Sequence, residues 1–138
     1  MKILAISDVP SKLLWDESVR KRLEGIDLIL SCGDLPKKYL EYLTNFTTVP
    51  ILYVHGNHDG SYKESEPGGC ICVDDAVYVW KGLRIMGLGG CNRYNRDDTF
   101  QYTEAEMRRR ARKLWLGNHY YYVTEMPEHV SDAYELCP

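Results

Sequence analysis

The chain has no stretch that approaches the roughly 18 consecutive apolar residues needed for a membrane-spanning helix, although 44% of its 138 residues are hydrophobic. It also lacks an excess of positive charge, because 20 acidic residues outnumber 17 basic ones and the net charge is −3. These absences argue against a membrane protein and against bulk electrostatic binding to nucleic acid or anionic lipid. Residues 1–8 are too short for a secretory apolar region, so the sequence predicts a cytoplasmic protein.

A regular cysteine pattern is missing as well. The five cysteines are odd in number and scattered, and the closest pair, Cys70 and Cys72, has a C-x-C spacing that is not that of a zinc knuckle. We therefore expect reduced thiols in a reducing compartment, with neither a disulfide framework nor a cysteine-based zinc site.

Apolar runs alternate with helical patterns in the first 60 residues. The runs predict strands at 2–7, 26–31 and 49–55, and the spacing of apolar residues predicts helices at 11–23 and 36–43. Short helical connections of this kind join parallel strands by right-handed crossovers. This half of the chain is therefore predicted to be a βαβαβ unit with a parallel sheet.

The second half has a different pattern. Three short strands separated by turn residues are predicted as β-hairpins, at 70–73, 76–80 and 84–88. Thr103 and Glu106 form a capping box that opens a helix running to about residue 113. A further strand is predicted at 120–124. With no repeat and no linker, the chain is predicted to form one domain over residues 1–138.

Polar clusters follow each of the first three predicted strands: Asp8, then Gly33-Asp34, then Gly56-Asn57-His58-Asp59. In open α/β sheets, ligands bind beyond the carboxyl ends of the strands, so these side chains are expected to converge. Helix capping is the alternative explanation for such residues. Capping does not require a glycine before Asp34 or before Asn57, whereas a sharp return of the backbone over the strand end does.

This pattern resembles the calcineurin-like metallophosphoesterases. That family has D-x-H after the first strand, G-D after the second and G-N-H-[DE] after the third, and later a lone His and G-H-x-H. Here Gly33-Asp34 matches G-D, and residues 56–59 are a complete G-N-H-D. The resemblance covers about residues 1–113 and leaves 114–138 as a divergent tail. It implies an α/β fold, in which the βαβαβ unit and the β-hairpins form a two-sheet sandwich with flanking helices.

The resemblance also implies roles for single residues. Asp34 would bridge two metal ions, Asp8 would bind the first ion and Asn57 the second. His58 would contact the phosphate or protonate the leaving alkoxide. Two cations about 3.5–4 Å apart activate an attacking water and neutralise charge on the phosphoryl oxygens. By this resemblance Asn57, His58 and Arg93 are the substrate-binding candidates.

The sequence departs from the family pattern at three places. Pro10 replaces the histidine of D-x-H, Glu125 stands where the lone histidine is expected, and no G-H-x-H occurs before Pro138. The sandwich and the dinuclear site are therefore expected to be incomplete, as in a C-terminally truncated family member. Asp8, Asp34 and Asn57 remain, with Glu125 as a candidate substitute ligand. An all-oxygen set favours Mn²⁺ or Mg²⁺ over Zn²⁺; Mn²⁺ is the leading expectation, and Fe is a further alternative.

Two functional hypotheses follow. The first is a metal-dependent phosphoric-ester hydrolase, weak or inactive in this truncated form. The alternative is a catalytically dead family member that serves as a binding or scaffold module. The predicted partner is a phosphate-ester substrate, with no membrane and no nucleic acid beyond a phosphodiester substrate. Because truncation would leave the apolar strands at 49–55 and 84–88 partly uncovered, self-association is also expected.

Overall fold

The first sheet is built from the apolar runs that the sequence analysis identified. In the computed structural model, which describes residues 1–95 and 99–116, four parallel strands lie in the order β1-β2-β3-β4. Their bounds are Ile3–Ile6 for β1, Leu28–Ser31 for β2, Ile51–Tyr53 for β3 and Ile71–Cys72 for β4. Every residue of β3 is buried, which suits a strand covered on both faces.

The register of the sheet aligns the ends of the first three strands. Ile6 pairs with Ser31, and Ser31 pairs with Tyr53. Because parallel strands run in the same direction, the residues that follow all three strands leave the sheet at one edge. This alignment puts the three polar clusters of the sequence at that edge.

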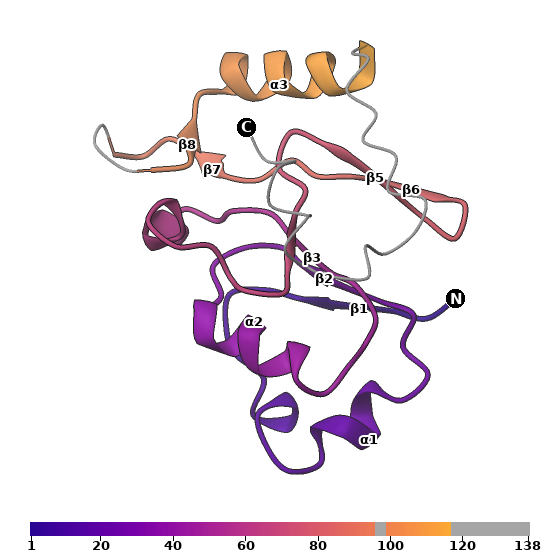
Figure 1. The fold of residues 1–138 in the computed structure, drawn as a ribbon. Coiled ribbons are helices and arrows are strands. Elements are labelled where there is room, and N and C mark those ends of the chain that lie inside the picture. The colour runs from indigo at the N-terminus through magenta and orange to yellow at the C-terminus, as the bar shows by residue number, and fades with distance from the viewer. Residues whose placement is uncertain (96–98, 117–138) are drawn as a thin grey trace.

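The two faces of the sheet are covered by different elements. The helices α1 (Val19–Leu23) and α2 (Lys37–Thr44) lie on one side (Figure 1). The hairpin of β5 (Val77–Trp80) and β6 (Leu83–Met86) lies on the other side, together with α3 (Glu104–Leu116). Alternation along the strands sends Ile29 and Ile51 into the core under α1 and α2, whereas Leu28 and Leu52 pack with Tyr78 of the hairpin. The parallel sheet is thus a layer between two apolar clusters.

The helix predicted over residues 11–23 is in fact two short segments, the 3-10 helix η1 (Lys12–Leu14) and α1. The carboxylate of Asp16 accepts hydrogen bonds from the backbone N–H of Ser18 at 2.7 Å and from its hydroxyl at 2.5 Å. A side chain that binds its own backbone two residues ahead favours a turn over a continuing helix. The apolar spacing is preserved, since Leu14, Val19 and Leu23 are all buried.

The second half begins differently from the prediction. The segment expected as part of a hairpin is β4, which pairs parallel with β3 through Leu52–Ile71 and Tyr53–Cys72. The chain between β3 and β4 contains the 3-10 helix η2 (Asp59–Lys63) and is long enough for a crossover, which parallel pairing needs. β4 therefore extends the first sheet instead of starting a second one.

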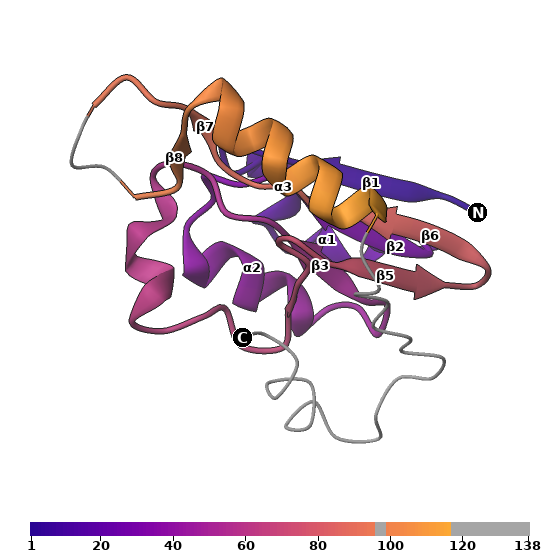
Figure 2. The same ribbon diagram turned by 90° about the horizontal axis from the view of Figure 1, so that it is seen from above.

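The remaining elements form two small pairs and a helix. β5 (Val77–Trp80) and β6 (Leu83–Met86) make an antiparallel hairpin. Lys81 and Gly82 at its turn have φ angles of 47° and 79°, as a two-residue hairpin loop requires. β7 (Cys91–Asn92) pairs with β8 (Gln101–Tyr102), which leads into α3 (Glu104–Leu116). Figure 2 shows α3 running across the top of the molecule.

The capping box before α3 is confirmed. The N–H of Glu106 donates to Thr103 Oγ1 at 3.3 Å, and the N–H of Thr103 donates to Glu106 Oε2 at 2.7 Å. The helix runs three residues further than predicted, to Leu116. Within residues 1–95 and 99–116, no helix is long and apolar enough to cross a membrane. The strand predicted at 120–124 lies outside the described residues.

Taken together, these elements confirm the predicted fold class, a mixed α/β domain in which a parallel βαβαβ sheet is followed by a hairpin and a flanking helix.

Candidate functional site

Backbone hydrogen bonds join the three loops that follow β1, β2 and β3. The N–H of Asp8 donates to the carbonyl oxygen of Gly33 at 3.1 Å. The N–H of His58 donates to Asp34 Oδ1 at 2.7 Å. The structure therefore brings the Asp8, Asp34 and Asn57-His58 segments together, as the positions of these residues at the strand ends predicted.

Asp8 and Asp34 share an unusual backbone conformation, with φ angles of 59° and 60°. Few residues other than glycine adopt this left-handed region, although Asp is among those that tolerate it. Such conformations cost about 1–3 kcal/mol each and cluster at functional sites. That both carboxylates have this conformation at the same sheet edge supports a common role. The sequence contains no signal for it.

The glycines of the two motifs are needed for close approach. A Cβ atom on Gly33, whose φ is 96°, would lie 2.6 Å from the backbone nitrogen of Gly56. A Cβ atom on Gly56 would lie 2.2 Å from Asp34 Oδ1. Only glycine at both positions lets the second and third loops pack with the Asp34 carboxylate between them.

Helix capping, the alternative explanation for the polar clusters, is wrong for these residues. The residues at the N-caps of the helices that follow are Ser11, Pro36 and His58, and none of them makes a side-chain capping hydrogen bond. Asp8, Asp34 and Asn57 occupy none of these cap positions. Their side chains are therefore available for another role.

The Asp59 side chain links the loop after β2 to the loop after β3. Its side chain is buried, and Oδ2 accepts the N–H of Asp34 and the N–H of Gly56, both at 2.8 Å. Burial raises the pKa of the Asp59 carboxyl, and the nearby Asp34 carboxylate adds to this, although the two N–H donors act against it. The last residue of G-N-H-D is thus a clamp between two loops, a role that the sequence analysis did not assign.

The side chains of Asn57 and His58 are accessible at the same edge. Asn57 is half-buried and His58 is exposed. The Nδ2 of Asn57 donates to the hydroxyl oxygen of Tyr94 at 2.9 Å. Within the described residues no hydrogen bond reaches Asn57 Oδ1, so the amide oxygen is available as a ligand. Tyr94 was missed by the sequence analysis, since it lies 37 residues along the chain.

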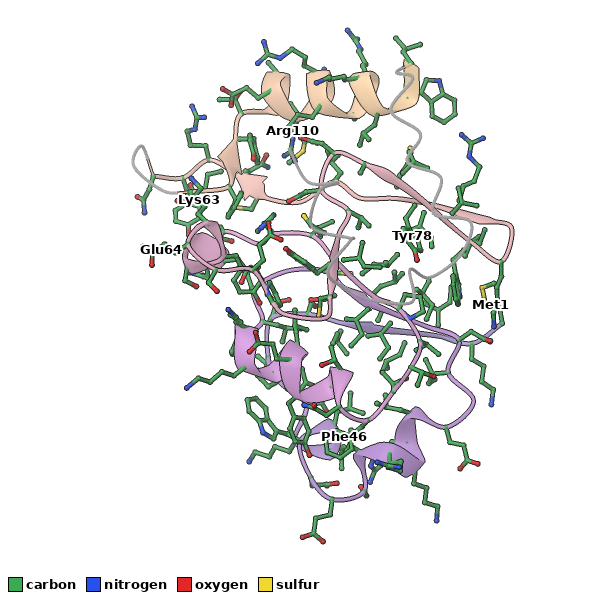
Figure 3. The ribbon with its side chains drawn as sticks, viewed as in Figure 1. Met1, Phe46, Lys63, Glu64, Tyr78 and Arg110 are labelled. Carbon is green, nitrogen blue, oxygen red and sulfur yellow. The ribbon has the colours of Figure 1, made fainter. Side chains whose placement is uncertain are left out.

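A second polar network holds His55, the residue directly before the G-N-H-D motif in the loop after β3. Asp74 Oδ2 lies 2.6 Å from His55 Nδ1, and Asp74 Oδ1 accepts the N–H of Gly89 at 2.6 Å. Arg110, on the side of α3 that faces the rest of the molecule (Figure 3), reaches Asp74 Oδ1 at 3.5 Å and donates to the Gly89 carbonyl at 2.8 Å. This network joins β3, the loop after β6 and α3.

Burial and pairing act in opposite directions on this network. Burial lowers the pKa of His55, but its hydrogen bond to Asp74 and the surrounding acidic groups outweigh that effect, and the pKa is raised. Burial alone would raise the pKa of Asp74, yet the hydrogen bonds from His55 and Gly89 lower it. Both shifts favour the charged pair. A Cβ atom on Gly89 would lie 2.6 Å from Asp74 Oδ1. Glycine at position 89 therefore lets the backbone pack against the Asp74 carboxylate.

Arg93, a candidate for substrate binding, lies on the loop between β7 and β8 and is exposed. Its Nη2 is 3.0 Å from Glu106 Oε2 and donates to the Gln101 carbonyl at 3.3 Å. Its guanidinium is thus already paired with a carboxylate, and contact with a substrate stays a prediction. Glu125, the candidate substitute ligand, lies outside the described residues.

The donor chemistry of the site fits a divalent cation. Two carboxylates and an amide oxygen are hard ligands that suit Mg²⁺ or Mn²⁺. Among the described residues, no group of three or more His, Cys, Asp or Glu side chains could hold a metal. Among the described residues, the set therefore depends on Asn57 as its third member.

The comparison with family models agrees with this architecture. The model of the calcineurin-like phosphoesterase superfamily domain matches residues 1–132 of the 138, and the chain belongs to this superfamily. It is thereby a member of a family of phosphoesterases, hydrolases that generally use divalent metals. No curated protein matches the chain.

Proposed function

We propose that the protein is a metal-dependent phosphoric-ester hydrolase with Asp8, Asp34 and Asn57 as its metal ligands. The observation that carries this proposal is the joining of the three strand-end loops, by Asp8 N–H to Gly33 and by His58 N–H to Asp34 Oδ1. The left-handed conformations of both aspartates support it, because strained backbone of this kind clusters at functional sites. Mn²⁺ is the proposed cation, since the donors are all oxygen.

Each residue has a distinct task in this proposal. Asp34, the central carboxylate, lies between the Asp8 loop and the Asn57 loop and would be shared by two ions. When bound, the cations would supply electrostatic stabilisation of the phosphoryl group and activation of water. His58 would hold a proton at an imidazole nitrogen and donate it to the leaving oxygen. Its exposed side chain is accessible to a substrate at this edge.

One observation favours the alternative, a catalytically dead family member that acts as a binding module. Pro10 occupies the place of a ligating histidine, and the described residues contain no cluster of three or more His, Cys, Asp or Glu able to hold a metal. A site with few ligands would hold cations weakly. The alternative predicts no turnover at saturating Mn²⁺, whereas the enzymatic proposal predicts a rate that rises with Mn²⁺ occupancy.

The deciding experiment measures metal binding and turnover together. The full chain is stripped with EDTA and titrated with Mn²⁺, and hydrolysis of p-nitrophenyl phosphate and bis-p-nitrophenyl phosphate is followed. Asp34→Asn should remove nearly all Mn²⁺ binding and turnover, because it removes the shared charge. Absence of both metal and turnover in the wild-type chain at micromolar Mn²⁺ would contradict the proposed function.

A second variant separates the two roles. His58→Gln should lower turnover by about 10²–10⁴-fold, the usual contribution of a positioned acid, while Mn²⁺ stoichiometry stays unchanged. The reason is that only the backbone of His58 contacts Asp34. Loss of Mn²⁺ from His58→Gln would show that the imidazole is a ligand and that this assignment of roles is wrong.

We also infer a cytoplasmic location. Cys32, Cys70 and Cys91 are free thiols, which is in keeping with a reducing compartment.

A further inference from the structure

We propose that Tyr94 is a positioning residue, which orients the Asn57 side chain so that its amide oxygen serves as the metal ligand. The inference rests on the proposed function and adds to it a residue outside every motif in the sequence. It starts from one contact, the hydrogen bond from Asn57 Nδ2 to the Tyr94 hydroxyl at 2.9 Å.

An asparagine ligand has an orientation problem that a carboxylate does not have. Its amide carries an oxygen at one end and two N–H donors at the other, and the terminal torsion has broad minima. A cation is attracted by the oxygen and repelled by the NH₂ group. A tyrosine hydroxyl can donate as well as accept, but when it serves as the acceptor of the NH₂ group, the amide oxygen is left in the ligating orientation. At Asn57 that acceptor is Tyr94, and Oδ1 makes no hydrogen bond among the described residues.

The loop that carries Tyr94 is itself held in place. The backbone N–H groups of Tyr94 and Asn95 both donate to Gln101 Oε1, at 3.0 and 3.1 Å. The Gln101 side chain belongs to a residue that is only 4% exposed. The N–H of Arg93 donates to the Tyr102 carbonyl at 3.0 Å. A buried amide thus fixes the position of the tyrosine before any ligand arrives.

Exposure argues against a purely structural role for this tyrosine. Tyr94 is 62% exposed, so its ring contributes little to the core. Among the described residues, the hydrogen bond that its side chain makes is the one with Asn57. Hydrogen-bond partners behind a metal ligand typically change metal affinity by about 10–100-fold when they are removed. A contact of this kind predicts an effect on metal binding without an effect on folding.

The test compares Mn²⁺ affinity with stability in Tyr94→Phe, which removes the hydroxyl and retains the ring. Tyr42→Phe is the matched control, since the Tyr42 hydroxyl donates to the Asp16 carbonyl instead of a site residue. The dissociation constant of Mn²⁺ is measured by electron paramagnetic resonance on the EDTA-stripped full chain, and the melting temperature is measured in EDTA.

We expect Tyr94→Phe to weaken Mn²⁺ binding by about tenfold or more, with a melting temperature in EDTA equal to that of the wild type. Tyr42→Phe should leave the affinity unchanged. Equal affinity of Tyr94→Phe and the wild type would overturn the inference while leaving the proposed function intact. A loss of affinity accompanied by a matching fall in melting temperature would overturn it as well, because the role would then be structural. If the wild type binds no Mn²⁺, the proposed function fails first and this inference fails with it.

Discussion

The two halves of the molecule differ in how well their strands are covered. In the first half, every residue of β3 and three of the four in β2 are buried. In the second half, three of the four residues in β6 are exposed, and Met86 retains 52% of its accessible surface. The parallel sheet has apolar clusters on both faces, whereas the hairpin packs by one face. The site is built on the well-packed half, and the second half supplies residues that fasten and orient it.

Left-handed backbone conformations occur in both halves: at Asp8 and Asp34 in the first, and at Asp75, Lys81 and Phe100 in the second. A backbone conformation that costs about 1–3 kcal/mol persists only where the surroundings over-determine it. Asp34 follows β2, three of whose four residues are buried, and the clamp at Asp59 fixes its backbone. Asp8 follows β1, in which no residue is buried, and its N–H donates to the carbonyl oxygen of Gly33. At the candidate site, these conformations are held by hydrogen bonds between the loops that follow the strands.

The largest expected effect tests this contrast in packing directly. Leu40, on α2, is fully buried, and Leu40→Ala should lower the free energy of unfolding by about 2–5 kcal/mol because it leaves a cavity. Met86→Ala, on the exposed face of β6, should cost well under about 1 kcal/mol. Urea unfolding of both variants gives the comparison. A similar loss in the free energy of unfolding for both variants would mean that the exposed face of β6 is covered in solution.

The next largest effect concerns the network that joins the halves. Asp74→Ala should destabilise the protein by about 2–3 kcal/mol, because it leaves His55 and the N–H of Gly89 without their buried acceptor. Asp75→Ala is the matched control: Asp75 also pairs with Arg110, at 2.9 Å, but its side chain is 51% exposed, so its loss should cost under about 1 kcal/mol. Amide hydrogen exchange in α3 should also be faster in Asp74→Ala than in the wild type. Unchanged exchange would show that the stability of α3 does not depend on this network.

A pH dependence follows from the same carboxyl group. The pKa of Asp74 is lowered in the folded protein, despite burial, by its hydrogen bonds from His55 and Gly89. Its contribution to stability is therefore present above the unfolded pKa near 3.8 and is lost as the pH falls through the folded value. Wild type and Asp74→Ala should accordingly converge in stability under acid, as measured by urea unfolding at several pH values. A constant difference down to pH 2 would contradict this.

The exposed face of the second half also predicts self-association. A groove of about 500 Å³ between the hairpin and α3 is lined by Val77, Arg84, Met86, Leu114 and Trp115. Apolar surface of this kind, beside an exposed strand, favours contact with a second copy of the chain. Light scattering should show a concentration-dependent mass that Met86→Lys reduces. A monodisperse monomer at every concentration would contradict the predicted self-association through this face.

The smallest expected effect is a difference in thiol reactivity. Cys70, which leads into β4, is buried, and burial raises the pKa of its thiol to about 12. Cys32, at the end of β2, is exposed. Alkylation at pH 8 should modify Cys70 at least about a hundredfold more slowly than Cys32, because the thiolate is the reactive form. Peptide mass spectrometry resolves the two sites, and fast labelling of Cys70 would reveal opening at the junction of the halves.

Much of the site could be predicted because it follows from strand ends. The positions of Asp8, Asp34 and Asn57 after three apolar runs were sufficient to predict their convergence, since parallel strands in register end at one edge. The capping box at Thr103 was equally local, and the contacts confirm it. Both features can be recognised from local patterns, because each strand-end residue follows an apolar run and the capping box spans four residues.

Other features could not be predicted, for a common reason. The break in the helix over residues 11–23 depends on the hydrogen bonds that the Asp16 carboxylate accepts from Ser18, which replace a continuing helix by a turn. The parallel pairing of β4 joins Leu52 with Ile71 and Tyr53 with Cys72, and β4 is a strand of only two residues. The contacts of Asp74 with His55 and of Tyr94 with Asn57 join residues 19 and 37 positions apart, and no periodicity in the sequence relates such residues.

The sequence by itself determined the superfamily, the parallel sheet and the edge at which the polar side chains gather, because strand direction and the order of motifs are properties of the chain. Only the tertiary structure decided how those side chains are held: the left-handed backbone of the two aspartates, the clamp at Asp59 and the hydroxyl that holds the Asn57 amide. These depend on atoms that meet across the fold within about 3 Å, a distance set by the packing of whole elements against one another.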